Sequence, residues 1–428
     1  MNTTAQYRKA LEAGRLDDQL VVMHGTSWLD SSYARIASLL DGMERHFGEG
    51  PAIIASAPGR TELGGNHTDH NHGHVLAAAV HLDCLAVAAP VDEPVVTIVS
   101  EGYDSAITVD LSDTAPRPLE EGTSEAMVRG VAHAFQRNGC GTGGFNACVS
   151  STICGGRAEF VGCLRGADRP HLQRAFQSRR RHPAGHRPRR TTRGERTFRK
   201  TCGFMDQMAS SFEGILSIDF ENAGNPALEH VQGGFEGSGY RLCVVDTGGS
   251  HADLTPDYAA IPEEMFAAAK ALGRESGRGV GMSELLGAAG SLRESVSDRA
   301  VMRLMHFVEE NERAVAQAEA LAAGDMARFL KLVAESGVSS CRLLQNCYST
   351  SRPTEQPVPL ALALTDRLLG GDGACRVHGG GFAGTIQVFV PDASFVGYRA
   401  FMEEVFGNGS VIPLDIRRPV PEILRVED

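Results

Sequence analysis

The sequence predicts an α+β fold in two lobes, because strand-like and helix-like segments are mixed without the regular alternation of a parallel sheet. Its 428 residues favour two or three domains over one. Hydrophobic residues make up 42% and charged residues 22%, the balance of a globular protein rather than of a disordered chain. No apolar run reaches the length of a membrane span, and residues 1–9 lack the apolar core of a secretion signal. We therefore expect a cytoplasmic protein without membrane contact.

The N-terminal half is expected to begin with helices and to continue mainly with strands. Apolar residues spaced three or four apart predict the helices, and short runs rich in β-branched residues predict the strands. The expected elements are amphipathic helices within 1–48, strands at 52–57 (ending at Pro58-Gly59), 75–89 and 95–99, a helix at 124–137 and a strand at 145–152.

The C-terminal half is expected to hold a long Ala-rich helical region between two groups of strands. A domain boundary is predicted near 214–222, which divides the chain into residues 1–214 and 215–428. The expected elements are a helix at 205–212, strands at 215–220 and 242–246, helices at 263–272, 301–321 and 326–333, strands at 374–378 and 385–390, and a helix near 395–406.

The charge is very unevenly distributed along the chain. The formal net charge is −12, yet residues 157–200 carry thirteen Arg and one Lys against three acidic residues, a local net charge of +11 that leaves −23 for the rest. A basic block of this kind can bind nucleic acid or an acidic partner. This block lacks interleaved aromatic residues and helical spacing, so we expect no nucleic-acid partner.

Ten cysteines are scattered between Cys84 and Cys375 without any C-x-x-C pair. This pattern indicates neither a zinc knuckle nor a disulfide framework, and we expect reduced thiols.

Common nucleotide and metal motifs are missing. The chain contains no Gly-Lys dipeptide and hence no Walker loop. Residues 139–144 match G-x-G-x-x-G formally but precede a strand, which indicates an ordinary turn. His67, His70, His72 and His74 match no standard zinc spacing, so the metal ligands stay unknown at this stage.

The densest group of functional residue types lies in residues 56–73, SAPGRTELGGNHTDHNHG. A strand leads here into a Gly-rich turn that carries a cation, carboxylates, an amide and imidazoles. Such a turn can present fixed polar groups to a polyhydroxylated ligand, although a solvated loop with capping residues has a similar composition.

These residues carry a resemblance to the galactokinases of the GHMP kinase superfamily. Residues 202–211, CGFMDQMASS, are similar to the segment that holds the family's catalytic Asp, and residues 378–385, HGGGFAGT, resemble its third motif. The three motifs occur in the family's order and spacing. The resemblance implies a two-lobed GHMP kinase fold of mixed sheets and helices with the active site between the lobes.

The resemblance also implies roles for individual residues. Asp206 would take the proton of the sugar C1 hydroxyl, and Arg60 would stabilise that carboxylate or the developing charge. The residues that would bind the substrate are Glu62, Asn66, His67, Asp69, Gly203 and Tyr258. The residues that would let the backbone approach the nucleotide are Gly155, Gly156, Gly379, Gly380, Gly381 and Gly384.

Two positions leave alternatives open. Many galactokinases have Gly-Glu-His-x-Asp where this chain has Asn66 in place of Glu, which weakens the inference of the sugar. Tyr258 matches a sugar-contacting Tyr of the family, but a core or surface Tyr is an equal alternative.

The family's second motif, a Gly-Leu-Ser-Ser-Ser-Ala-Ala loop that opens a helix, should follow residues 152–156 but is absent. Its backbone N–H groups would hold the ATP phosphates, with its Ser and a following Glu at Mg²⁺. The basic block occupies its place and has the same length. Codons for residues 157–169 can be chosen so that reading one base later gives G-L-S-S-S-A-A-F-E-V-L-I.

We therefore hypothesise that residues 157–201 are a frameshifted segment, either in the gene or by sequencing error, within a galactokinase that uses ATP and Mg²⁺. As printed, the chain is expected to bind both poorly. The alternatives are another GHMP sugar kinase, acting on N-acetylgalactosamine or arabinose, and a non-catalytic galactose-binding regulator. Galactose and ATP are the expected partners, and the protein is expected to be a monomer.

Overall fold

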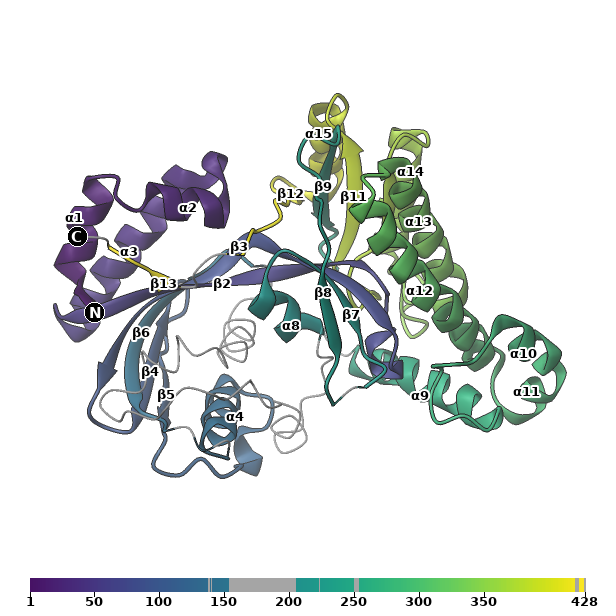
Figure 1. Cartoon of the computed structure of the whole chain (residues 1–428), viewed down its shortest axis with the longest axis horizontal. Coiled ribbons are helices and arrows are strands. Elements are labelled where there is room, and N and C mark those ends of the chain that lie inside the picture. Colours follow the sequence, from purple (N-terminus) through teal and green to yellow (C-terminus); the bar gives the residue numbers. More distant parts are fainter. Residues whose placement is uncertain are drawn as a thin grey trace. The chain divides into compact units, whose positions relative to one another are not determined.

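The computed structural model divides the chain into two compact units (Figure 1). Unit 1 contains Met1–Arg60, Ala79–Glu213 and Arg417–Asp428, and unit 2 contains Thr61–Ala78 and Gly214–Ile416. The structure describes residues 1–428 except 138, 140, 154–204, 223, 250–253, 420–422 and 427–428. The two units and the two domains predicted from the sequence share a boundary near residue 214. The domain division into 1–214 and 215–428 stays a prediction, since the units also exchange two shorter segments.

Unit 1 is built on one sheet with helices. The strand order is β1-β2-β3-β6-β4-β5, and β13 also pairs with β2. The strands are β1 (Asn2–Thr3), β2 (Pro51–Gly64), β3 (His74–Val91), β4 (Val95–Ser100), β5 (Ile107–Asp110), β6 (Gly144–Ser151) and β13 (Ile423–Leu424). The helices are α1 (Thr4–Glu12), α2 (Asp17–His24), α3 (Leu29–Phe47), α4 (Ser124–Arg137) and α8 (Met205–Phe212).

Strand β3 is buried on both faces, which explains its long apolar run. It pairs antiparallel with β6 from Cys84↔Ser151 to Val91↔Gly144, whereas β4 and β6 are parallel. Leu85 and Val87 pack in the core formed with α1, α2 and α3, while Ala86 and Ala88 pack in the core formed with α4. Successive side chains of a strand point to opposite faces, so one strand serves both cores.

Unit 2 holds a second sheet and most of the long helices. Its four strands follow the order β10-β11-β9-β12, and β7 pairs with β8 and with the first residues of β3. The strands are β7 (Ile215–Asp219), β8 (Ala227–His230), β9 (Tyr240–Asp246), β10 (Ala374–Val377), β11 (Thr385–Pro391) and β12 (Val411–Pro413). The helices are α9 (Thr255–Ala271), α10 (Met282–Gly287), α11 (Ala289–Ser295), α12 (Asp298–Ala322), α13 (Met326–Ser339), α14 (Pro357–Leu369) and α15 (Phe395–Phe406).

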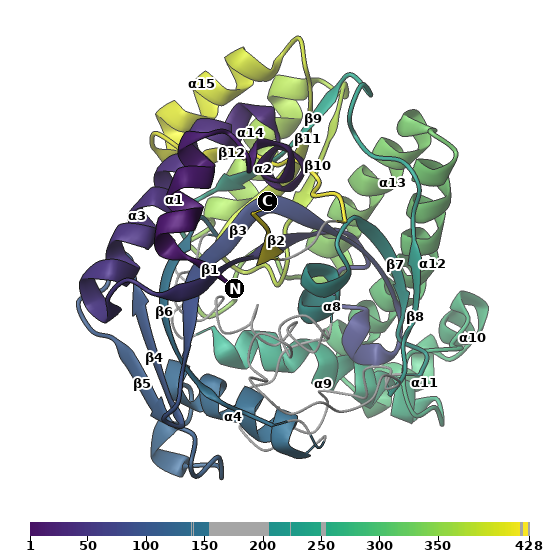
Figure 2. The same cartoon turned by 60° about the vertical axis from the view of Figure 1, so that its left-hand side comes forward.

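The long helix α12 organises the helical part of unit 2. It packs on α9 and α13, and Figure 2 shows α12 and α13 side by side. Leu304 and Phe307 are buried on the side of α12 that joins the core containing α9. His306 and Glu310 of the same helix are also buried and make polar contacts that are described below. Helix α12 therefore delivers both apolar and polar groups to the interior.

The expected boundaries of β2 and α9 differ most from those of the structure. β2 continues through Pro58-Gly59 to Gly64 instead of ending there. Helix α9 begins at Thr255, eight residues before the predicted start, and includes Pro262. Helix α14 was not predicted. It has prolines in its first turn, which a helix tolerates because the N–H groups there have no partner within the helix.

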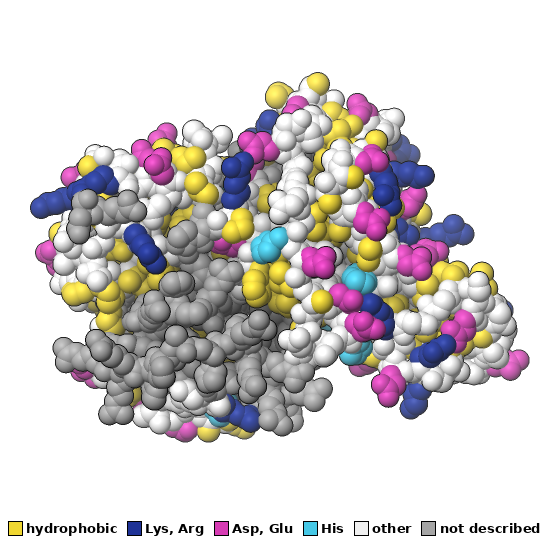
Figure 3. Space-filling view, viewed as in Figure 1, with side chains coloured by type: hydrophobic (Ala, Val, Ile, Leu, Met, Phe, Trp, Pro, Cys, Tyr) yellow, Lys and Arg dark blue, Asp and Glu magenta, His cyan; other side chains and the backbone are white. Residues whose placement is uncertain are grey.

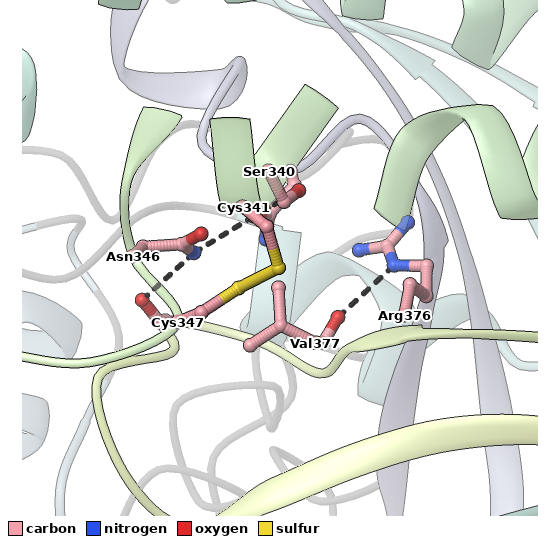
Figure 4. Close-up of a disulfide and its surroundings, with 8 residues drawn as sticks. Ser340, Cys341, Asn346, Cys347, Arg376 and Val377 are labelled. Carbon is pink, nitrogen blue, oxygen red and sulfur yellow. Dashed lines mark hydrogen bonds between the residues drawn. A yellow bond between two sulfur atoms is a disulfide. The ribbon is translucent and has the colours of Figure 1, made fainter. Parts of the chain in front are cut away.

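The expectation of reduced thiols was wrong for one pair of cysteines. Cys341 and Cys347 form a disulfide across a sequence separation of six residues (Figure 4). Cys341 lies in the π-helical turn Ser340–Leu344 that follows α13. Cys84, Cys148, Cys243 and Cys375 are free and buried.

The described residues contain no helix that is both long and apolar enough to cross a membrane. On the face drawn in Figure 3, acidic and basic side chains of the described residues are interspersed. The basic block 157–200 lies outside the described residues.

Candidate active site

The predicted catalytic residues Arg60 and Asp206 form a bidentate pair in unit 1. Nε and Nη2 of Arg60 donate to the two carboxylate oxygens of Asp206 at 2.6 and 2.9 Å. Arg60 comes from β2, and Asp206 lies in the first turn of α8, where the partial positive charge of the helix N-terminus favours an anion. The Arg60 and Asp206 side chains are 28% and 44% exposed. The carboxylate is therefore fixed in orientation and still accessible to a ligand.

A buried ion pair anchors the other end of α8. Glu213, directly after the helix, lies 3.1 Å from Nε of Arg417, and both side chains are fully buried. Arg417 also donates to Oγ of Ser56 at 2.6 Å, four residues before Arg60 on β2. These contacts connect the end of α8 to the strand that carries Arg60, which helps to hold Asp206 against its partner.

The Gly-rich signature folds as a tight turn in unit 2, between β2 and β3. Gly65 has φ +85°, and a Cβ there would lie 2.4 Å from the carbonyl oxygen of His74, so this position requires glycine. Oγ1 of Thr68 donates to the carbonyl oxygens of Gly65 and His74 at 2.8 and 2.5 Å. His67 and His72 also adopt positive φ, at 58° and 64°.

The buried carboxylate of Glu310 caps this turn. It accepts hydrogen bonds from the backbone N–H groups of Gly65 and Asn66 at 3.1 and 3.2 Å, and from Oγ of Ser336 at 2.6 Å. Burial opposes its ionisation, but the charges of His306, Arg313 and Arg376 and the bond from Ser336 lower the pKa of Glu310 to about 2. Glu310 therefore holds the signature backbone as a carboxylate at neutral pH.

His67 faces Gly379–Gly381 of the third motif, which we call the glycine loop. Its Nε2 lies 2.9 Å from the carbonyl oxygen of Gly380. A carbonyl oxygen only accepts, so Nε2 carries the proton and Nδ1 of the neutral ring is an acceptor. Burial lowers the pKa of His67 to about 3. The ring is thus neutral at physiological pH, with Nδ1 suited to accept from a hydroxyl.

Glu62 and Asn66 are held together in the interior of unit 2. The carboxylate of Glu62 forms a buried ion pair with Arg376. Oε1 of Glu62 also accepts from Nδ2 of Asn66 at 3.0 Å. Thr61, next to Glu62, contacts Nε2 of His378 at 3.0 Å through its Oγ1. The signature and the third motif are therefore linked by several side chains.

Tyr258 of α9 contacts the same glycine loop. Its hydroxyl donates to the carbonyl oxygen of Gly381 at 2.9 Å, and its ring packs edge-on against Phe382. Burial, with a contribution from the charge of Asp257, raises the pKa of Tyr258 to about 12. A Cβ at Gly380 would lie 2.6 Å from Cε1 of the Tyr258 ring. These contacts are more than a surface Tyr would make, whereas a core Tyr stays an alternative to the predicted contact with the sugar.

The remaining predicted residues lie elsewhere or outside the described residues. Oδ1 of Asp69 accepts from the backbone N–H of His70 at 2.9 Å. The carbonyl of Gly384 accepts from N and Oγ1 of Thr247 at 2.8 and 2.6 Å. Gly155, Gly156 and Gly203 are not among the described residues. Within the described part of the chain, no group of three His, Cys, Asp or Glu residues could hold a metal ion.

Sequence reasoning missed several residues that support this site. They are buried polar residues that contact the signature from distant parts of unit 2, and no spacing pattern marks them. They are His306, Glu310, Ser340, Asn346 and Arg376.

Two solved structures with a similar fold are those of small-molecule kinases. The galactokinase of Lactococcus lactis in complex with galactose aligns with a TM-score of 0.71 and 19% identity, covering 89% of this chain and 98% of that chain. The mevalonate kinase of Methanococcus jannaschii aligns with a TM-score of 0.56 and 12% identity, covering 86% and 99%. The fold is that of the GHMP kinase superfamily, as the sequence predicts.

Sequence comparison narrows this class to one family. The galactokinase galactose-binding signature matches residues 44–90. Human galactokinase is 30% identical over 392 residues, which cover 88% of this chain and 94% of the relative. Canis lupus familiaris galactokinase is 31% identical over 380 residues, covering 85% and 91%. This chain belongs to the galactokinase family, a family of sugar kinases.

Proposed function

We propose that this family member, with residues 157–201 in the shifted frame, transfers the γ-phosphoryl group of ATP to the C1 hydroxyl of galactose. The observation that carries the proposal is the accessible, bidentate Arg60–Asp206 pair in a chain of this family. Asp206 accepts the proton of the C1 hydroxyl, the sugar oxygen bonds to the γ-phosphorus, and the bond to the β–γ bridging oxygen breaks to release ADP. Arg60 holds both oxygens of Asp206 throughout.

The sugar is proposed to bind against the signature turn and the glycine loop. Nδ1 of His67 would accept a sugar hydroxyl, and the Asp69 carboxylate and the Tyr258 hydroxyl would contact others. Each such contact penalises an epimer that leaves a buried polar group unpaired. In the chain with 157–201 in the shifted frame, Mg²⁺ would be held partly by the Ser and Glu of the restored second motif. Its chemistry would be to neutralise charge on the phosphates.

The printed sequence of 157–201 favours a second candidate for the chain as it stands, namely galactose binding without turnover. The residues proposed to bind the sugar lie outside this segment, whereas the expected phosphate loop is replaced by the basic block. We therefore propose that the chain with 157–201 in the shifted frame is an active kinase and that the printed chain is not. The cytoplasmic location and the monomeric state stay predictions.

Two purified proteins test the proposal, the printed full-length chain and the same chain with 157–201 in the shifted frame. Both are expected to bind galactose in calorimetry. Only the second is expected to turn over with Mg-ATP, at roughly 1–100 per second. If neither protein binds galactose, the proposed substrate is wrong. Turnover of that order by the printed chain would contradict the claimed loss, and sequencing of the gene would show which chain exists. N-acetylgalactosamine and arabinose serve as competing substrates.

A further inference from the structure

Every hydrogen-bonding group of the Asn66 side chain is already used inside unit 2. Nδ2 donates to Oε1 of Glu62 at 3.0 Å and to the carbonyl oxygen of Gly379 at 2.7 Å. Oδ1 accepts from Oγ of Ser340 at 3.3 Å and from Nδ2 of Asn346 at 2.9 Å. A carboxamide has two N–H donors and two lone pairs, so this set is complete. Asn66 is 0% exposed.

The backbone of Asn66 is equally occupied. Its N–H donates to Glu310 at 3.2 Å, and its carbonyl oxygen accepts from Nε2 of His306 at 3.0 Å. The buried side chain therefore has no group left to bind a sugar hydroxyl in this arrangement. This distinguishes Asn66 from its neighbour His67, whose Nδ1 remains an acceptor.

The orientation of the amide is determined by its neighbours. Its nitrogen faces a carboxylate oxygen of Glu62 and the carbonyl of Gly379, and both of these only accept. A carboxylate at position 66 would place negative charge against both. Many galactokinases have Glu at this position. In this chain the neighbouring buried carboxylate of Glu62 is already paired with Arg376, and the amide of Asn66 can donate to it where a second carboxylate could not.

Asn66 belongs to a set of side chains that holds three successive carbonyls of the glycine loop. The Gly379 carbonyl accepts from Asn66, the Gly380 carbonyl faces His67 and accepts from Nδ2 of Asn346 at 3.2 Å, and the Gly381 carbonyl accepts from Tyr258. The loop conformation is thus set by residues on both sides. Movement of Asn66 would shift the loop and with it the His67 ring.

The two residues that donate to Oδ1 of Asn66 are themselves held by the disulfide. Ser340 directly precedes Cys341, and Asn346 directly precedes Cys347 (Figure 4). The crosslink closes the short segment whose two ends present these donors. The backbone N–H of Phe382 also donates to the carbonyl oxygen of Asn346, which ties this segment to the glycine loop.

We propose that Asn66 is a positioning residue that acts on galactose only through the Gly379–Gly381 loop and His67, and that Glu62 requires an amide at this position. The inference rests on the proposed function, since it concerns binding of the same sugar. The sequence predicts that Asn66 and Glu62 contact the sugar directly, whereas in this proposal both residues act indirectly.

Monodeoxy analogues of galactose distinguish an indirect role from direct contact. Kd is measured by calorimetry for galactose and for its 2-, 3-, 4- and 6-deoxy forms, with the wild-type printed chain and Asn66→Asp. We expect Asn66→Asp to weaken binding of galactose roughly 10- to 100-fold, and by the same factor for every analogue. A direct contact would give one analogue that both proteins bind equally, and this result would overturn the proposal.

Further variants keep the test decisive. Glu62→Gln combined with Asn66→Asp exchanges the amide and the carboxylate, and we expect it to recover part of the lost affinity, because the Gly379 carbonyl still faces the new carboxylate; no recovery would overturn the claim that Glu62 requires an amide at position 66. If Asn66→Asp does not fold, Ser340→Ala is expected to give a uniform weakening of roughly 2- to 5-fold, and a penalty confined to one hydroxyl would again contradict the proposal.

Asn408→Asp, the same substitution at an exposed position of unit 2, is the matched control and should leave all Kd values unchanged. Absence of galactose binding by the wild type would instead contradict the proposed function.

Discussion

Two arginine–carboxylate pairs begin two residues apart on β2 and have opposite surroundings. Arg60 pairs with Asp206 in unit 1, where the side chains are 28% and 44% exposed. Glu62 pairs with Arg376 in unit 2, where the side chains are 4% and 0% exposed. An exposed pair contributes little to stability, whereas removal of one partner of a buried pair leaves an uncompensated charge. The accessible Arg60–Asp206 pair can therefore take part in a reaction, whereas the buried Glu62–Arg376 pair can stabilise the fold.

Asp206→Asn gives the largest expected effect on activity. In the chain with 157–201 in the shifted frame, we expect kcat to fall about 10²- to 10⁴-fold, because the acceptor of the C1 proton is lost. Galactose Kd should stay within about twofold of the wild-type value. Steady-state assays and calorimetry measure both quantities. A decrease in affinity that accounts for the whole loss of kcat/KM would show that Asp206 binds the sugar instead.

Arg376→Met is expected to give the largest loss of stability. The substitution leaves the Glu62 carboxylate buried without its cation, which typically costs about 3–5 kcal/mol of unfolding free energy. Urea denaturation measures this value. The matched control is Arg399→Met, which breaks the more exposed Arg399–Glu403 pair and should cost less than about 1 kcal/mol. Equal losses for the two variants would remove the distinction between buried and exposed pairs.

Removal of the disulfide is expected to have an intermediate effect. A crosslink that closes so short a loop is worth about 2 kcal/mol in the chain-entropy account. Cys341→Ser combined with Cys347→Ser should lower the unfolding free energy by about this amount and weaken galactose binding, because Ser340 and Asn346 lose their constraint. A thiol titration of the unfolded wild-type chain with and without reductant provides the control. Unchanged stability and unchanged affinity together would contradict the role given to the crosslink.

The pH dependence of His67 is the smallest expected effect. Its pKa is lowered from 6.5 to about 3 in the folded chain, so between these values only the unfolded chain binds a proton. Stability is therefore lost as pH falls from about 6.5 towards 3, by about 1–2 kcal/mol between pH 7 and 5. His67→Gln should flatten this part of the curve in urea denaturation at several pH values. Identical slopes for both proteins would mean that the pKa of His67 is the same in the folded and the unfolded chain.

The sequence predicted most of the described strands and singled out Arg60 and Asp206 as candidate catalytic residues, for physical reasons that can be named. Apolar and β-branched runs mark buried strands such as β3, and Asp206 and Arg60 lie in motifs that are continuous in sequence. The extension of β2 was missed because Pro58 and Gly59 usually interrupt strands. Here a Cβ at Gly59 would lie 3.2 Å from the carbonyl oxygen of Leu82, which shows a close approach of backbones that glycine permits.

The support of the site could not be predicted from the sequence. Arg376 and Asn346 reach Asn66 and its partner Glu62 across about 280 to 314 residues of chain, and only the folded structure brings them together. The disulfide has no diagnostic spacing either, since five residues separate its cysteines. Asn66 therefore looked like a sugar ligand in the sequence, although the structure surrounds it with protein partners.

The division of the two units has a consequence for a gene with a damaged phosphate loop. The signature turn and the glycine loop belong to unit 2, and neither contains any of residues 157–201. Such a lesion would abolish phosphorylation of the sugar and leave the binding of the sugar intact. The resulting protein would sequester galactose and compete with intact kinase molecules for it. Under the proposed function, such a protein would lower the concentration of free galactose in proportion to its own concentration.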